Sequence, residues 1–210
     1  MNLDDLKQQK RWVCYSATKM PICPHNGKPA SSSDPDTWAT YDEAVYAMRR
    51  LRLVGVGFTL NGDGLVGIDL DDCIASDGTL SKYAAYLVGL CGGYIERSPS
   101  RKGLHLVGRA HLVKSAKKLM HGIGVEVYGT GRYLTYTGDV FDVDYDDFGS
   151  VQDVVDTVLD DIAALSTPRP STPTAPLGAP SDDQHDIWIA RAVRMVTNAK
   201  EGERHNTRVK

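Results

Sequence analysis

The fold class is indicated by one stretch of the sequence: Val54-Gly-Val-Gly-Phe-Thr-Leu60, then Asn61-Gly-Asp-Gly64, then Leu65-Val-Gly-Ile-Asp-Leu70. Both outer segments are short apolar runs that contain β-branched or aromatic residues, a composition typical of strands. The segment between them carries two glycines and an Asp-Gly pair, which supply the backbone conformations that a tight turn requires. The stretch therefore predicts two strands joined as an antiparallel β-hairpin.

Helices and further strands are predicted on both sides of this stretch. Thr40 suits the N-cap of a helix over 41–51, because its hydroxyl can accept a hydrogen bond from an exposed backbone N–H. Two more helices are predicted over 81–91 and 151–165, the second from an apolar stripe at helical spacing. Two further antiparallel pairs are expected, 94–97 with 104–107 and 125–128 with 133–137. This mixture predicts an α+β domain with a mainly antiparallel sheet.

The composition changes sharply at one place along the chain. Five of the ten prolines lie between residues 168 and 180, a density that no regular element tolerates. We therefore expect a main domain over 1–166, a proline-rich linker over 167–180 and the start of a helical segment over 181–210. One amphipathic helix cannot bury its apolar face alone, so this segment is expected to continue in a longer protein. A tail that packs back on the main domain is the alternative.

The net charge of −3 over 210 residues conceals an uneven distribution. Nine acidic and no basic residues lie between Asp139 and Asp161, whereas eight basic residues and one acid lie between Lys82 and His121. Such a basic stretch is either a solvated face or a phosphate-binding surface. No apolar run approaches the roughly 20 residues that span a bilayer, which excludes a membrane protein. The four cysteines form no CxxC pair, which favours a reducing compartment over a disulfide framework.

Two carboxylates end the second strand of the opening stretch. In Asp69-Leu-Asp71 the alternation of a strand places both aspartates on one face. A bound cation would relieve their mutual repulsion, and a pair of carboxylates with substrate phosphates suits Mg²⁺ or Mn²⁺. A solvated loop after the strand is the alternative interpretation.

A basic turn lies between the predicted strands 94–97 and 104–107. It has the sequence Ser98-Pro-Ser-Arg-Lys-Gly103, and His105 follows on the next strand. Hydroxyls, backbone N–H groups and cations that converge in this way bind phosphate. The spacing differs from that of a P-loop. An ordinary basic hairpin with a structural histidine is the alternative.

Glu126 is a third acidic candidate, because it is the single acid in the apolar segment 125–128. A carboxylate buried in a strand needs a partner or a metal ion, whereas an edge strand would expose it to water. Together, Asp69, Asp71 and Glu126 would hold two divalent ions while the basic turn holds a triphosphate. Two-metal nucleotidyl transfer requires this combination.

The order of these motifs resembles a known family. It consists of Asp-x-Asp at 69–71, Ser-x-Lys-Gly-x-His at 100–105, and apolar-Glu-apolar at 125–127 followed by Gly-x-Gly-Arg-Tyr-apolar-Thr at 129–135. This order resembles the primase–polymerase (prim-pol) domains of phage and plasmid replication proteins, which belong to the archaeo-eukaryotic primase (AEP) superfamily. The opening of the chain, with Lys10-Arg-Trp-Val-Cys14, also fits, so that the resemblance covers roughly residues 10–140.

The resemblance implies a role for each matching residue. Asp69, Asp71 and Glu126 match the catalytic metal ligands of the family. The residues that match its nucleotide- and phosphate-binding positions are Ser100, Lys102, His105 and Arg132. The implied fold is an antiparallel, RRM-like catalytic sheet with a flanking α/β unit.

The implied activity is template-directed nucleotidyl transfer, as a DNA primase and DNA polymerase that uses Mg²⁺ or Mn²⁺. The implied partners are single-stranded DNA, nucleoside triphosphates and a helicase domain that follows in the full-length protein, all in the cytoplasm of a bacterial host. One alternative is a metal-dependent nuclease or a nucleotide-sugar transferase that uses the Asp-x-Asp motif. The other is a non-catalytic single-stranded DNA-binding module that uses the basic stretch 82–121.

Overall fold

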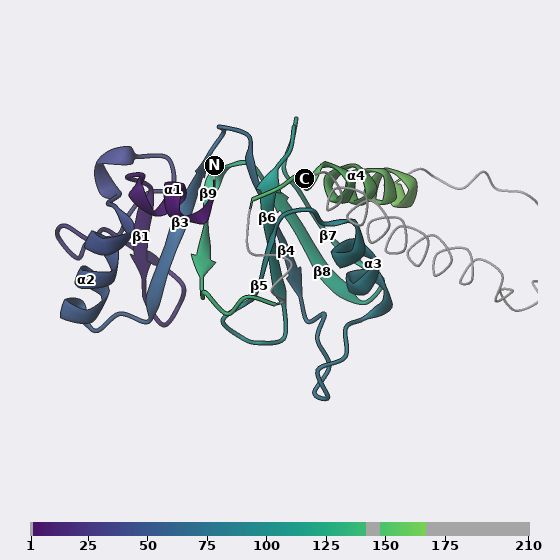
Figure 1. The fold of residues 1–210 in the computed structure, drawn as a ribbon, viewed down its shortest axis with the longest axis horizontal. Helices are drawn as coiled ribbons and strands as arrows, with labels where there is room; N and C mark the ends of the chain where they lie inside the picture. The colour runs from purple at the N-terminus through teal and green to yellow at the C-terminus, as the bar shows by residue number, and fades with distance from the viewer. Residues whose placement is uncertain (1, 142–147, 167–210) are drawn as a thin grey trace, which may run out of the picture.

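A computed structural model describes residues 2–141 and 148–166, which fold into two antiparallel sheets with helices packed around them (Figure 1). The expected α+β class with mainly antiparallel pairing is therefore confirmed. The expected linker over 167–180 and the helical segment over 181–210 lie outside the described residues.

The four-stranded sheet contains β1 (Trp12–Tyr15), β2 (Pro21–Ile22), β3 (Gly55–Asn61) and β9 (Thr130–Tyr136). The five-stranded sheet contains β4 (Leu65–Asp71), β5 (Tyr94–Arg97), β6 (Leu104–Arg109), β7 (Ala116–Met120) and β8 (Ile123–Tyr128). The helices are α1 (Leu3–Gln8), α2 (Tyr41–Leu51), α3 (Lys82–Leu90) and α4 (Gln152–Ser166). The strand orders are β2-β1-β3-β9 and β5-β6-β4-β8-β7.

The three predicted helices are present within one residue of their expected bounds. α2 begins with a capping box, in which the Thr40 hydroxyl accepts from Glu43 N–H and the Glu43 carboxylate accepts from Thr40 N–H. Ser81 caps α3 by accepting from the N–H of Ala84. No helix within the described ranges is long and apolar enough to cross a membrane.

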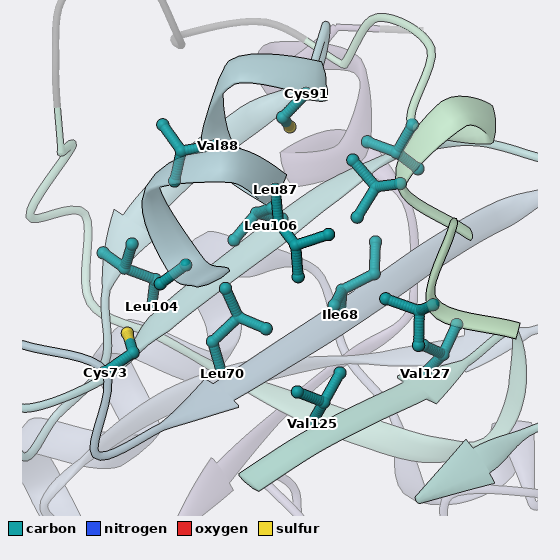
Figure 2. Close-up of a cluster of buried hydrophobic side chains, with 14 of the residues drawn as sticks. Ile68, Leu70, Cys73, Leu87, Val88, Cys91, Leu104, Leu106, Val125 and Val127 are labelled. Carbon is teal, nitrogen blue, oxygen red and sulfur yellow. The ribbon is translucent and has the colours of Figure 1, made fainter. Parts of the chain in front are cut away.

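The two faces of β4 have different environments. Ile68 and Leu70 point toward α3 and α4 and pack in a buried apolar cluster with Leu87 and Val88 of α3 (Figure 2). Because side chains alternate along a strand, Asp69 and Asp71 point to the opposite face, which Gly67 shares. The four-stranded sheet lies on that side (Figure 1). The chemistry-bearing residues of β4 therefore face the junction between the sheets.

The predicted hairpin between β3 and β4 is wrong. β3 pairs with β1 and β9, and β4 pairs with β6 and β8, so the turn 61–64 crosses from one sheet to the other. Arg11, which is 1% exposed, holds this crossing by donating to the carbonyl of Thr59 and to the side chains of Asn61 and Asp63. The chain does turn at 61–64, but strands distant in the sequence, β1 and β9, occupy both edges of β3.

The predicted pairing of 125–128 with 133–137 is also wrong. β8 pairs with β4 and β7, whereas β9 pairs with β3 in the other sheet. The chain therefore crosses between the sheets a second time, and a hydrogen bond from Gly62 N–H to the Gly129 carbonyl (2.9 Å) ties the two crossings together. The predicted pair 94–97 with 104–107 is confirmed as β5 and β6.

The sheets approach each other closely at Gly67. A Cβ atom at this position would lie 2.0 Å from Cδ1 of Leu134 on β9, so no larger residue fits without a shift. Gly67 lies on the same face of β4 as Asp69, two residues before it. This contact places β9 directly beside the acidic end of β4.

Candidate active site

One cross-strand row connects all five strands of the larger sheet. Glu96 of β5 is in register with His105 of β6, which is in register with Asp69 of β4. Asp69 is in turn opposite Glu126 of β8, which is opposite Lys117 of β7. Directly opposed side chains on adjacent strands lie within interaction distance. Residues separated by up to 57 positions in the sequence thus form a continuous line of charged and polar groups.

Asp69 is the least satisfied member of this row. Its Oδ1 atom is buried and has no hydrogen-bond partner among the described residues. The Nε2 atom of His105 lies 3.8 Å away, which is too long for a hydrogen bond. Burial raises the pKa of Asp69, and the nearby Asp71 and Glu126 carboxylates act in the same direction, against the opposing effect of His105. A cation at Oδ1 would compensate this buried oxygen.

Glu126 is held from both sides. The Tyr128 hydroxyl donates to its Oε2 at 2.5 Å, and the ammonium of Lys117 contacts its Oε1. Burial acts to raise the pKa of Glu126, but the hydrogen bonds from Lys117 and Tyr128 outweigh it and the pKa is lowered. Glu126 is half-buried in a central strand, so the alternative of an edge strand in water does not apply.

Arg132 reaches this group from the other sheet. It lies on β9, and its guanidinium lies over the Tyr128 ring at 4.8 Å from the ring centroid. Its charge also acts on Glu126. The fold therefore brings the arginine predicted from the family resemblance to the Glu126 side of the site, although its own sheet is different.

His105 is 3% exposed and lies between two carboxylates. Its Nδ1 atom is 2.9 Å from Glu96 Oε1, and its Nε2 faces Asp69. Burial acts to lower the pKa of His105, but the hydrogen bond with Glu96 and the charges of Asp69 and Glu96 outweigh it, and the pKa is raised. A phosphate-binding role for His105 would use the Nε2 side of the ring.

Glu96 is a site residue that the sequence analysis missed. It is 2% exposed and accepts hydrogen bonds from the Tyr94 hydroxyl and from the backbone N–H groups of Thr137 and Gly138, besides its contact with His105. Like Glu126, it is a single acid in an apolar strand. The rule that singled out Glu126 would have found it.

Asp71 ends β4 on the same face as Asp69 and is exposed. It is opposite Gly124 of β8, where an added Cβ atom would lie 3.1 Å from the Asp71 Cβ. The small residue at position 124 therefore leaves the Asp71 carboxylate open toward solvent. The fold thus gives the two aspartates the shared face that their spacing predicted, one buried and one exposed.

The basic turn lies against the end of β4. A Cβ atom at Gly103 would lie 2.5 Å from the Leu70 carbonyl oxygen, so glycine permits this contact. The Ser100 hydroxyl is within 3.0 Å of the Ser98 hydroxyl and accepts from the Lys102 N–H, which shapes the turn. Both Ser100 and Lys102 are exposed. The turn therefore flanks the Asp71 end of the site.

A cavity of about 170 Å³ opens next to the row, at the junction of the two sheets. Asp69 and His105 line it from the five-stranded sheet. The residues that line it from the other side are Lys19, Tyr133, Leu134 and Thr135. A larger groove of about 530 Å³ lies between α2 and the basic turn and contains no member of the row.

The donor set suits a hard divalent cation. Carboxylate oxygens are the ligands that Mg²⁺ and Mn²⁺ prefer, and the buried Asp69 oxygen lacks a partner. Within the described ranges, no three or more His, Cys, Asp or Glu side chains are arranged to hold a metal ion. Lys117 and Tyr128 contact the two oxygens of Glu126. Lys117 is largely exposed, so its side chain is able to move away.

The structure brings most of the predicted site residues together. Asp69, His105 and Glu126 share the row, Asp71 follows on the same strand, and the basic turn with Ser100 and Lys102 packs against that strand end. Arg132 approaches from β9. The residues that the sequence analysis did not assign to the site are Lys19, Glu96, Lys117 and Tyr128.

The acidic, histidine-containing row has the donor groups that suit divalent metal ions and phosphates, and a comparison with known sequences points in the same direction. A DNA primase-polymerase of Nitratiruptor phage NrS-1 is 39% identical to the chain over 145 residues, which is 65% of this chain. The match spans 20% of that relative's length. No protein-family model matches the chain. The predicted resemblance to phage primase–polymerases is therefore confirmed.

Proposed function

We propose that this domain catalyses template-directed nucleotidyl transfer on single-stranded DNA, as a DNA primase and DNA polymerase in phage replication. The observation that carries this proposal is the register of Glu126, Asp69 and His105 on three adjacent strands, with one buried Asp69 oxygen that lacks a partner. The similarity to a phage DNA primase-polymerase supports the reaction class. Mg²⁺ or Mn²⁺ is the proposed cofactor.

The proposed roles follow from position. Asp69, Asp71 and Glu126 would hold the divalent ions. When bound, such ions activate an attacking hydroxyl and stabilise the leaving pyrophosphate. The other proposed groups act on the substrate: His105 Nε2 and Lys102 bind its phosphates, and Ser100 shapes the turn that presents Lys102.

Arg132 has a different proposed role, because it approaches from the sheet opposite the acids. Its guanidinium lies over the Tyr128 ring, and its N–H groups would donate to a nucleotide bound at the sheet junction. The arrangement of acids on one side and cations around them is what binding a metal–triphosphate complex requires.

The decisive test is synthesis on a circular single-stranded DNA without a primer, with ribonucleotide and deoxyribonucleotide pools supplied separately. The wild-type protein is expected to make product with Mn²⁺ or Mg²⁺, and Asp69→Asn is expected to make none. Asp77→Asn is a matched control, because Asp77 is an exposed acid that hydrogen-bonds to Thr79 within its own loop. Wild-type protein without synthesis on any template or nucleotide pool would disprove the proposal.

A parallel reaction separates the alternatives. A nuclease would degrade labelled single-stranded DNA with Mn²⁺ in the absence of nucleotides, and Lys102→Ala would not reduce that activity. Binding of single-stranded DNA without synthesis, unchanged by removal of divalent ions, would indicate the non-catalytic module. We further propose that the enzyme acts in the host cytoplasm alongside a helicase activity.

A further inference from the structure

Lys19 lies in a loop whose backbone is fixed by hydrogen bonds. The loop joins β1 to β2 in the four-stranded sheet. The Lys19 N–H donates to the Ser16 carbonyl at 2.9 Å, and the Ser16 N–H donates to the Met20 carbonyl at 3.0 Å. Lys19 adopts a left-handed backbone conformation with φ 58°, which residues with a side chain seldom adopt. The loop thus has a defined shape.

A second contact places this loop over β9. The hydroxyl of Tyr133 donates a hydrogen bond to the backbone carbonyl of Lys19. Tyr133 is on the strand that lies beside the acidic end of β4, and it lines the 170 Å³ cavity together with Lys19. The lysine is therefore presented at the cavity by the sheet that contains none of the proposed metal ligands.

Lys19 lines this cavity together with Asp69 and His105. Its positive charge acts on both of these groups. Lys19 nevertheless forms no ion pair within 4.0 Å with any residue that the structure describes. A cation that lies at a polar cavity, on an ordered loop and without an anionic partner, is suited to bind an anionic ligand there.

We propose that Lys19 binds the triphosphate of the incoming nucleotide from the side opposite the basic turn, so that the nucleotide is held between the two sheets. This inference rests on the proposed function, because it uses the same cavity. It adds a binding residue from the N-terminal part of the chain, about 80 residues before the basic turn. A structural role for the ammonium is disfavoured, since the loop is held by backbone groups and Tyr133.

The test compares Lys19→Gln and Lys19→Arg with wild-type protein. Both variants keep an unbranched polar side chain at position 19, but Gln removes the positive charge and Arg keeps it. Lys7→Gln is the matched control. Lys7 lies on α1, where it forms an ion pair with Asp4, and it does not line the cavity. Equilibrium binding of a non-hydrolysable deoxynucleoside triphosphate with Mn²⁺ is measured, together with binding of single-stranded DNA.

We expect Lys19→Gln to weaken nucleotide binding roughly tenfold, the loss expected for one charge-assisted hydrogen bond. Lys19→Arg and Lys7→Gln are expected to bind the nucleotide within about twofold of wild type, with DNA binding unchanged in all three. In steady-state synthesis, Lys19→Gln should raise the KM for the nucleotide by a similar factor with little change in kcat.

Two results would overturn the inference: an unchanged nucleotide affinity in Lys19→Gln, or an equal loss of affinity for single-stranded DNA. Failure of the proposed function is visible separately. If wild-type protein binds the triphosphate through Lys19 but makes no DNA, the function is wrong and the Lys19 site stands. If wild-type protein makes DNA with a KM that does not depend on Lys19, only the inference is wrong.

Discussion

The carboxylate of Glu96 lies 2.9 Å from Nδ1 of His105, and the two residues are directly opposed on neighbouring strands. Besides a hydrogen bond from the Tyr94 hydroxyl, Glu96 accepts from the N–H groups of Thr137 and Gly138 in the segment that follows β9. One buried side chain thus connects the histidine of the site to the chain segment that returns from the other sheet. Its replacement should affect both.

Glu96→Gln is expected to destabilise the fold by about 2 kcal/mol, because an amide cannot accept hydrogen bonds on both of its atoms. One of the N–H or O–H donors that surround Glu96 would then face the NH₂ group of the new glutamine. Urea unfolding would measure this loss. Glu43→Gln is the control, since glutamine also serves in a capping box and Glu43 is exposed. An unchanged unfolding midpoint in Glu96→Gln would contradict the arrangement.

Asp69→Asn is expected to abolish DNA synthesis and to stabilise the metal-free protein by about 1 kcal/mol. The reason is that asparagine removes a buried charge whose Oδ1 has no partner and which is repelled by Asp71 and Glu126. Thermal unfolding in a chelator should show the increase in melting temperature. Mn²⁺ should raise the melting temperature of wild type but not of the variant. Equal Mn²⁺ effects on both would argue against Asp69 as a ligand.

Gly67→Ala is expected to lower the free energy of unfolding by about 2 kcal/mol, because the new methyl group would overlap Leu134 Cδ1. Leu134→Ala should recover part of that loss, which a double-mutant cycle would show as a favourable coupling. Gly89→Ala is a control that is expected to raise the free energy of unfolding instead of lowering it. It lies in α3 with no atom within 4 Å of its Cβ position, so alanine should stabilise the helix by about 1 kcal/mol. Additive effects at 67 and 134 would contradict the close contact.

Asp63 should contribute to the acid sensitivity of the fold. Burial acts to raise its pKa, but the charge and hydrogen bond of Arg11 and the hydrogen bond from the Leu65 N–H outweigh this, and the pKa is lowered. A carboxyl whose pKa is lower in the folded state stabilises the fold above its unfolded pKa of roughly 3.9. That contribution is lost as the pH falls through the lower folded value.

Asp63→Asn should therefore reduce stability by about 1 kcal/mol at pH 7, with the difference from wild type disappearing at low pH. Urea unfolding across the range from pH 7 to pH 2 would test this. Asp77→Asn, which changes an exposed acid outside any ion pair with the described residues, should leave the pH-7 stability close to that of wild type. A pH-independent deficit at position 63 would show that the ion pair with Arg11 is not its source.

The sequence by itself was sufficient to predict three of the helices, six of the strands and the chemistry proposed for the site, but not α1, β1, β2 or β7. Helix 41–51 follows from Thr40 and an amphipathic pattern, and the strands follow from short apolar runs, because these signals depend only on near neighbours. The alternation along β4 was sufficient to place Asp69 and Asp71 on one face. The order of acidic and basic motifs was sufficient to indicate a primase–polymerase.

Only the tertiary structure decided which strands pair and which residues join the site. The glycine-rich segments 61–64 and 129–131 have the composition of hairpin turns, but each crosses between sheets, since β3 finds its partners in β1 and β9. Strand pairing depends on contacts between distant segments, which no local pattern specifies. For the same reason, the position of Lys19 beside Asp69 and His105 at one cavity is visible only once both sheets are in place.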